Sequence, residues 1–69
     1  MQVIKLRDDF KKLGQAIKAA GLVESGVEAK IVIQNGEVKV NGVVETQRGK
    51  KLTGGEIISY NGEEIKIER

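Results

Sequence analysis

Residues 25–42 read SGVEAKIVIQNGEVKVNG and predict, in order, a capped helix, a glycine stop, a short strand and a tight turn. Ser25 and Glu28 have the spacing of a capping box. In such a box the serine oxygen accepts a hydrogen bond from a backbone N–H near Glu28, and the carboxylate accepts one from the N–H of Ser25. Gly36 follows the apolar part of this segment, and glycine readily adopts the left-handed conformation that ends a helix. The segment therefore predicts a helix that leads directly into a hairpin.

The hairpin is predicted from Val38 onward. Val38 and Val40 alternate with polar residues, which is the period of a half-buried strand. Asn41 and Gly42 form the pair most typical of a two-residue hairpin turn, because both positions require a positive φ. Residues 43–46 are therefore expected to return as the second strand.

The segments on either side of residues 25–42 supply the rest of the predicted fold. Residues 3–6 alternate as a short strand, and residues 56–60 and 63–68 predict two more strands, joined by a second turn at residues 61–62. Between the first strand and Ser25, apolar residues recur at spacings of three and four and predict a helix over residues 13–20. The members of this stripe are Phe10, Leu13, Ile17 and Ala20, and Gly21 is the expected cap.

The second helix is expected over residues 26–35. Ala29, Val32 and Ile33 share one face of it and should pack on the first helix, because the two helices are joined by only a few residues. The predicted order is one strand, two helices and four strands.

Composition limits the possible functions. The chain has 69 residues, which suits one domain spanning 1–69 with a small core. It contains no cysteine and no histidine, which removes disulfides, thiolate nucleophiles and the usual zinc ligands, and the lack of cysteine fits a reducing cytoplasm. No apolar run approaches the length of a membrane span, so no membrane partner is expected. Phe10 and Tyr60 are the only aromatic residues, so base stacking on a row of rings is not expected either.

The common catalytic sites are not expected from this set of side chains. Without histidine or cysteine there is no Ser/His/Asp triad and no Cys/His pair, and the glycines form neither a Walker loop nor a dinucleotide fingerprint. Most carboxylates fall on strand and turn positions, with no apolar pocket that would separate two of them as acid and base. We therefore predict no catalytic residue, no metal site and no cofactor.

Charge is segregated along the chain although the net charge is only +2. Arg48, Lys50 and Lys51 surround a glycine in a predicted loop, and no acid lies between Thr46 and Gly55. Lys11, Gln15 and Lys18 share the polar side of the first predicted helix. Such a basic loop beside basic helix positions indicates either an anionic partner or a solvated surface, and charge alone leaves both open. The terminal hairpin is mostly acidic, so Lys66 and Arg69 are expected to contribute little to binding.

The chain resembles the RNA-binding domain named after ribosomal protein S4, also called the alpha-L motif. The resemblance covers residues 12–58, about two thirds of the chain, and it is closest to the short stand-alone bacterial members. It rests on residues at the family's spacing: Lys12-Leu13, Ile17, Ser25, Ala29, Val32-Ile33, Gly36, Val38, Val40-Asn41-Gly42 and Gly55-Glu56-Ile57. Lys12 and Gly14 stand where arginine and aspartate are usual, and Gly26 replaces a familiar arginine.

What the resemblance implies is an α+β fold, the alpha-L RNA-binding motif, with two packed short helices followed by a small, mostly antiparallel sheet of hairpins. It also implies non-catalytic binding of structured RNA, ribosomal or transfer RNA, through a basic surface on the two helices and the loop after the first hairpin. Lysine and arginine would meet phosphates, and the polar residues would reach sugars or base edges. The expected RNA-binding residues are Lys12, Gln15, Lys18, Ser25, Lys30, Asn41, Thr46, Arg48, Lys50 and Lys51.

A second interpretation belongs to a different class. The chain could be a protein-interaction or assembly adaptor, for example on a ribosome, with a ribosomal or maturation-factor protein as its partner. It would dock through apolar strand residues or through the acidic C-terminal hairpin, and an exposed apolar patch would favour it.

Overall fold

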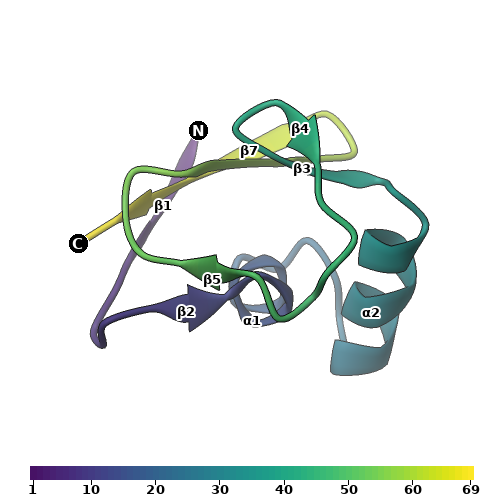
Figure 1. Ribbon diagram of the computed structural model, residues 1–69, viewed down its shortest axis with the longest axis horizontal. Coiled ribbons are helices and arrows are strands. Elements are labelled where there is room, and N and C mark those ends of the chain that lie inside the picture. Colours follow the sequence, from purple (N-terminus) through teal and green to yellow (C-terminus); the bar gives the residue numbers. More distant parts are fainter.

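In the computed structural model, which describes residues 1–69, a five-stranded sheet is covered on one face by two helices and a separate two-stranded ladder (Figure 1). In chain order the elements are β1 (Gln2–Lys5), β2 (Lys11–Lys12), α1 (Leu13–Ala19), α2 (Gly26–Gln34), β3 (Val38–Val40), β4 (Val43–Val44), β5 (Lys51–Leu52), β6 (Ile57–Tyr60) and β7 (Glu63–Glu68). The predicted α+β class is confirmed. Neither helix has the length and apolar character needed to cross a membrane.

The large sheet has the strand order β1-β7-β6-β3-β4. Only the pairing of β1 with β7 is parallel, so the sheet is mostly antiparallel as expected. Both predicted hairpin turns are confirmed, with φ of 52° at Asn41 and 82° at Gly42 in the first turn and the same signs at residues 61–62. The return strand β4 is shorter than the expected residues 43–46: the N–H of Glu45 still donates to the carbonyl of Val38 in β3 at 3.0 Å, and the chain then leaves the sheet toward α1.

The core lies between the sheet and the helices and contains only apolar side chains. Its buried members are Leu13, Ala16, Ile17, Val23, Ala29, Val32, Ile33, Val38, Val40, Leu52, Ile58, Ile65 and Ile67. The predicted burial of Ile17, Val32 and Ile33 is therefore confirmed. Burying one side chain of this size typically contributes about 1.5–3 kcal/mol to folding.

The ends of α2 follow the sequence signals with one difference. Ser25 Oγ accepts a hydrogen bond from the N–H of Glu28 at 3.1 Å, as predicted. The carboxylate of Glu28, however, accepts from the N–H of Glu24 at 2.8 Å and not from Ser25, because the backbone at Ser25 is extended and the carboxylate reaches one residue farther back. At the other end Gly36 has φ of 78° and closes the helix as expected.

The structure corrects the prediction for residues 10–12. Phe10 is partly exposed and precedes a short strand, so the helical stripe begins at Leu13. Lys11 and Lys12 form β2, which pairs antiparallel with β5, and Lys11 therefore does not share a helix side with Gln15 and Lys18. The chain thus has two strands before its helices and five after them.

The predicted loop at Gln47–Lys51 is also shorter than expected. Lys51 belongs to β5 and lies opposite Lys12. The N–H groups of Leu13 and Gly14, at the start of α1, donate to the carbonyl oxygens of Lys50 and Arg48 at 2.8 and 3.0 Å. These bonds bring the two segments together, so the residues before Leu13 are extended rather than helical.

Candidate nucleic-acid interface

The loop at residues 47–50 is fixed by the backbone and not only by its side chains. Besides its two bonds to α1, it closes on itself through the N–H of Lys50, which donates to the carbonyl of Gln47 at 3.1 Å. The N–H of Gln47 in turn donates to the carboxylate of Glu45 at 3.1 Å. The cations of this loop therefore project from a held backbone, which lowers the entropy that binding would cost.

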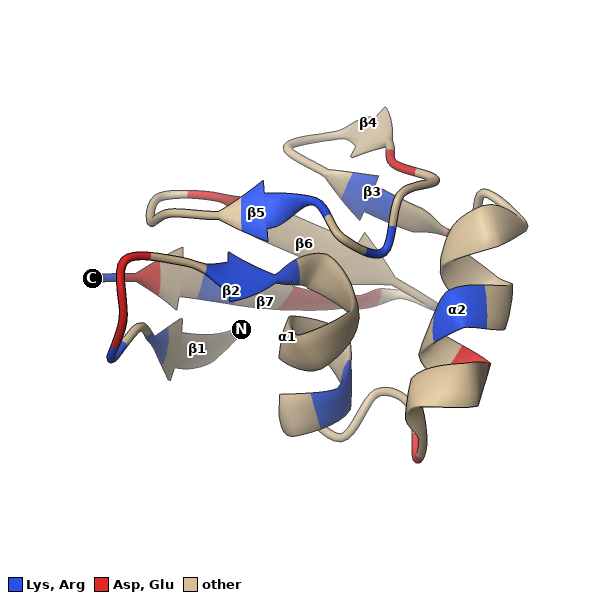
Figure 2. Cartoon of the chain, turned by 60° about the horizontal axis from the view of Figure 1, so that its bottom comes forward, with Lys and Arg blue, Asp and Glu red and all other residues tan.

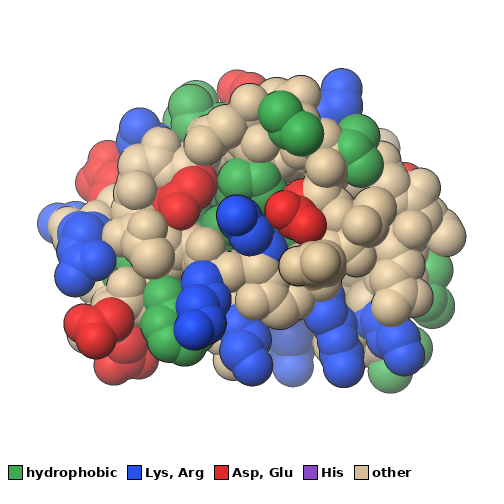
Figure 3. Space-filling model, in the orientation of Figure 1, with side chains coloured by type: hydrophobic (Ala, Val, Ile, Leu, Met, Phe, Trp, Pro, Cys, Tyr) green, Lys and Arg blue, Asp and Glu red, His purple; other side chains and the backbone are tan.

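Two segments without a single acid meet at this place. Residues 10–23 and residues 46–55 contain no Asp or Glu, and β2 and β5 pair them. Figure 2 shows the Lys and Arg segments of β2, β5, the loop, α1 and α2 on one side of the molecule. We call the exposed cations of this side the basic face: Lys12, Lys18, Lys30, Arg48 and Lys51. In Figure 3 Lys and Arg side chains form a row along the lower edge of the molecule.

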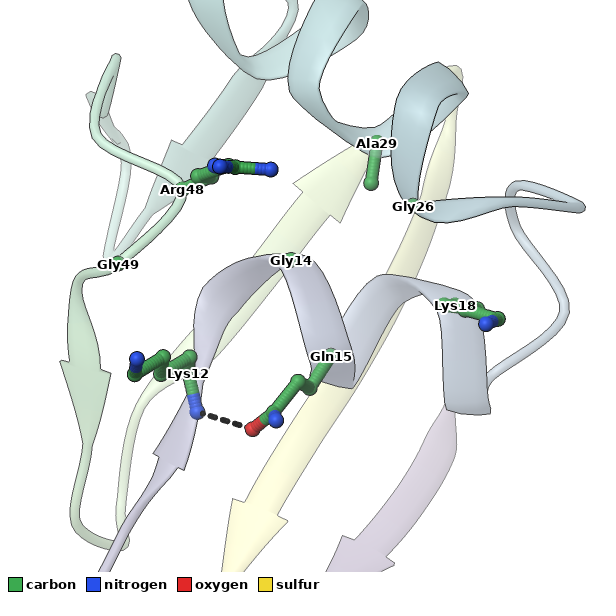
Figure 4. A pocket seen from close by; sticks show the side chains of 8 residues that line it. All are labelled: Lys12, Gly14, Gln15, Lys18, Gly26, Ala29, Arg48 and Gly49. Carbon is green, nitrogen blue, oxygen red and sulfur yellow. Dashed lines mark hydrogen bonds between the residues drawn. The ribbon is translucent and has the colours of Figure 1, made fainter.

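A hollow of about 380 Å³ lies within the basic face (Figure 4). It is lined by Lys12, Gly14, Gln15, Lys18, Gly26, Ala29, Arg48 and Gly49, with no acidic side chain among them. Gly26 keeps the α2 side open, since a Cβ atom there would meet nothing within 4 Å. The arginine that the resembled family carries at this position would have room, so its absence enlarges the hollow and removes one cation.

Gln15 supplies a polar group at the same hollow. Its side-chain oxygen accepts a hydrogen bond from the N–H of Lys12 at 3.2 Å (Figure 4). The bond orients the amide, whose NH₂ group makes no hydrogen bond within the protein. This arrangement offers two kinds of donor, ammonium and amide, to one anionic or polar ligand.

Lys30 reaches the basic face from α2. It lies four residues after Gly26, which lines the hollow, and positions four apart share a helix face. The cations of the basic face therefore lie on both helices, on the β2–β5 ladder and on the loop.

Two of the predicted residues lie elsewhere. Asn41 and Lys50 line a second hollow of about 400 Å³ that also contains Glu45 and Glu56, so its charge is mixed; Lys51 of the basic face borders this hollow too. The side-chain oxygen of Asn41 accepts from the N–H of Ile57 at 2.9 Å, which ties the hairpin turn to β6. The structure therefore does not bring these two residues together with Lys12 and Arg48.

Glu56 supplies a negative charge to the second hollow. Burial raises the pKa of Glu56, but hydrogen bonds from the N–H groups of Thr53 and Gly54, at 2.9 and 2.8 Å, outweigh it and lower the pKa below the ordinary 4.5. The carboxylate is therefore charged at neutral pH.

Ser25 and Thr46 are exposed, and neither lines the hollow of the basic face. Ser25 Oγ already accepts the capping bond of α2. Thr46 lies directly before the loop.

Arg69 is one residue whose place the sequence did not indicate. Its Nη1 donates to the carbonyl oxygens of Thr53 at 3.1 Å and Asp9 at 3.4 Å. Asp9 lies just before the β2 segment and Thr53 directly follows β5, so one side chain holds both segments. No local pattern could have revealed this contact, because residue 69 meets residue 9 only in the folded chain.

Comparisons with known proteins identify the domain. A sequence profile of the S4 domain matches residues 4–68. The solution structure of YbcJ from E. coli, described as having an alpha-L motif involved in RNA binding, superposes with a TM-score of 0.77 and 34% identity, covering 100% of this chain and 89% of that one.

Three relatives share much of the sequence. YbcJ of Escherichia coli (strain K12) is 39% identical over 56 residues, which cover 81% of this chain and 80% of the relative. A protein of Bacillus subtilis (strain 168) named probable ribosome maturation protein RlbA is 34% identical over 59 residues, 86% of this chain and 83% of its own length. Ribosomal large subunit pseudouridine synthase B of the same organism is 44% identical over 60 residues, 87% of this chain but only 23% of the synthase.

Proposed function

The chain belongs to the S4 domain family, and we propose that it binds structured RNA through the basic face without catalysing a reaction on it. The observation that carries the proposal is the meeting of two acid-free segments at one surface, where Lys12, Arg48 and Lys51 project from a held backbone. Lysine and arginine in this setting replace the counterions of RNA phosphates, which is the main source of affinity.

Recognition by shape suits this surface better than reading of stacked bases. One aromatic ring, that of Phe10, lies against Lys51 of the basic face, which is too few for a row of stacked bases. RNA helices are recognised mostly through phosphates and 2′-hydroxyl groups. The NH₂ group of Gln15 lies among the cations and could donate to a sugar or base edge. Ser25 and Thr46 are exposed next to Gly26 and to the loop, respectively, and remain in the proposed set of contacts.

Ribosomal RNA is the favoured ligand. Two relatives carry names that refer to the ribosome, a probable maturation protein and a large-subunit pseudouridine synthase. The chain corresponds to only 23% of that synthase, which supports a binding role apart from the modifying reaction. Action on ribosomal RNA would place the protein in the cytoplasm, with transfer RNA as the second RNA to test.

Crosslinking in cells tests the proposal. The tagged chain is crosslinked, and the RNA that copurifies is sequenced, beside a variant with Lys12, Arg48 and Lys51 all replaced by Gln. Ribosomal RNA should be enriched with the parent and depleted with the variant. Equal enrichment with both would contradict the proposed surface, and no enrichment with the parent would contradict RNA binding itself.

A protein-docking role is the second candidate. Val27 and Ile31 are 69% and 52% exposed and lie one turn apart on α2, which is a small apolar stripe next to the basic face. Replacing both by Ser leaves every cation in place. If this variant loses ribosome association while the Lys12/Arg48/Lys51 variant retains it, the adaptor function is favoured over RNA binding.

A further inference from the structure

The ladder of β2 and β5 places two lysines of the basic face directly opposite each other. Its register pairs Lys12 with Lys51 and Lys11 with Leu52. Leu52 is fully buried, whereas Lys12 and Lys51 are exposed, so the two ammonium groups project from the outer side of the ladder. Side chains opposite each other in an antiparallel pair begin only about 4.5–5.5 Å apart at Cβ.

Two like charges at such a position destabilise a ladder that has only two residues in each strand. No ion pair relieves the repulsion: residues 10–23 and 46–55 contain no acid, and Glu45 and Glu56, which share the second hollow with Lys51, form no salt bridge with it. The ammonium groups of Lys12 and Lys51 therefore repel each other, and an anion between them would be attracted to both.

Neighbouring groups limit the freedom of both lysines. The ammonium of Lys51 lies 4.8 Å from the centre of the Phe10 ring, a cation–π distance. The N–H of Lys12 is bonded to the side chain of Gln15, and the carbonyl of Lys50 accepts from the N–H of Leu13. The two lysines therefore project from a frame that is in place before any ligand arrives.

We propose that Lys12 and Lys51 form a clamp for a single phosphate group, and that an occupied clamp stabilises the β2–β5 ladder. A phosphate oxygen can accept from each ammonium, and the divalent or monovalent anion offsets the repulsion that the ladder otherwise carries. The clamp rests on the proposed RNA-binding function for its natural source of phosphate, either a backbone phosphodiester or a terminal phosphate. Its central property can be tested with inorganic phosphate and no RNA.

The test is a double-mutant cycle of thermal melts on the parent, Lys12→Gln, Lys51→Gln and the double variant. Each is melted in chloride and in inorganic phosphate at equal pH and ionic strength. In chloride Lys12→Gln should melt at or above the parent temperature, because one of the opposed charges is gone. Lys51→Gln removes the same repulsion but also the contact with Phe10, so it should gain less than Lys12→Gln. In phosphate the parent should gain stability with concentration, and each single variant should lose roughly half or more of that gain.

Lys39→Gln is the matched control, since Lys39 is exposed on β3 outside the ladder. It should keep the full response to phosphate. An equal phosphate response in all variants, or additive effects of the two lysine substitutions in both salts, would overturn the clamp. Amide NMR shifts give a second readout: phosphate should move the signals of residues 11–12 and 51–52 and leave those of β3 in place.

Two RNA arms distinguish the sources of the phosphate. The same ribosomal RNA hairpin is titrated with a 5′-hydroxyl and with a 5′-phosphate end. A loss of affinity in Lys51→Gln for both hairpins assigns the clamp to a backbone phosphate, and a loss for the 5′-phosphate hairpin alone assigns it to the terminal group. If neither hairpin distinguishes the variants from the parent, the clamp is not an RNA contact and the inference fails. If the parent binds no RNA at all, the proposed function fails, while the phosphate melts still decide whether the clamp exists.

Discussion

Arg69 connects the last residue of the chain to the segments that carry the basic face. Its guanidinium donates to carbonyl oxygens of Asp9 and Thr53, which flank the β2–β5 ladder. The β2–β5 ladder has few hydrogen bonds between its own strands. The hydrogen bonds from Arg69 therefore contribute a large share of its stability.

Replacing Arg69 by Gln should therefore loosen the ladder although no cation of the basic face changes. We expect the free energy of unfolding to fall by about 0.5–1.5 kcal/mol, the usual net value of such hydrogen bonds. Hydrogen exchange should show faster exchange at residues 11–12 and 51–52 than at β6. An Arg69→Lys variant keeps the charge but lacks the guanidinium that donates to both carbonyls, so its exchange should be as fast as that of Arg69→Gln. Exchange as slow as in the parent in both variants would contradict the role of Arg69 in stabilising the ladder.

Gly14 and Gly21 form a matched pair because they lie at opposite ends of α1. A Cβ atom at Gly14 would meet Arg48 at 3.6 Å and Ala29 at 3.9 Å, which is ordinary contact, whereas Gly21 has φ of 77°. Gly14→Ala should raise the free energy of unfolding by about 0.4–1 kcal/mol, through the less flexible unfolded chain. Gly21→Ala should lower it by about 1 kcal/mol, because the residue is forced into a left-handed conformation. Chemical denaturation of the two variants measures both, and the same sign for both would contradict this account.

At the scale of elements, α2 depends on its cap. Ser25 Oγ accepts the N–H of Glu28, one of the four donors that a helix start leaves without a partner in the helix. Ser25→Ala should lower the free energy of unfolding by about 1 kcal/mol, as measured by urea denaturation. Ser59→Ala, on β6, removes a hydroxyl without a capping bond and should cost less; an equal cost would argue against the cap.

The turn between β5 and β6 should make stability depend on acid pH. Glu56 accepts hydrogen bonds from Thr53 and Gly54, and its pKa in the folded protein is lowered from the ordinary 4.5. Because the unfolded chain binds the proton more readily, this contribution is present above about pH 4.5 and is lost as the pH falls through the folded pKa. Denaturation of the parent and Glu56→Gln across this range should show a smaller pH dependence in the variant. Parallel curves would contradict the assignment.

Local signals predicted the elements that depend on neighbouring residues. The turn at Asn41-Gly42, the glycine ends of both helices and the cap at Ser25 each need only a few adjacent residues. The β2–β5 ladder was missed because two lysines have no strand period and their partners lie far along the chain. Asn41, in the hairpin turn, and Lys50, in the loop, face the second hollow for a similar reason: no local pattern indicates the direction in which either residue faces in the folded chain.

At the scale of the whole molecule, the two faces differ in how charge is arranged. The register of the large sheet places Lys39 opposite Ser59, and Ser59 opposite Glu64, on the side away from the helices. Lys66 lies opposite Val3 and Ile57 on that same side. Cations there are mixed with acids, whereas the hollow of the basic face has no acidic side chain in its lining. RNA should therefore approach the helix and ladder side.

The most direct test of the proposed function is a titration of a ribosomal RNA hairpin at several salt concentrations. The basic-face variant replaces Lys12, Arg48 and Lys51 by Gln, and its control replaces Lys5, Lys39 and Lys66 by Gln for the same change of charge. Circular dichroism confirms that both variants are folded.

Each phosphate contact contributes a slope of roughly −0.7 to −0.9 to the dependence of log affinity on log salt. The basic-face variant should therefore bind more weakly and have a slope flatter by about two to three units, while the control variant follows the parent closely. Equal slopes for the parent and the basic-face variant, or the same flattening in the control, would contradict the claim that this face binds RNA.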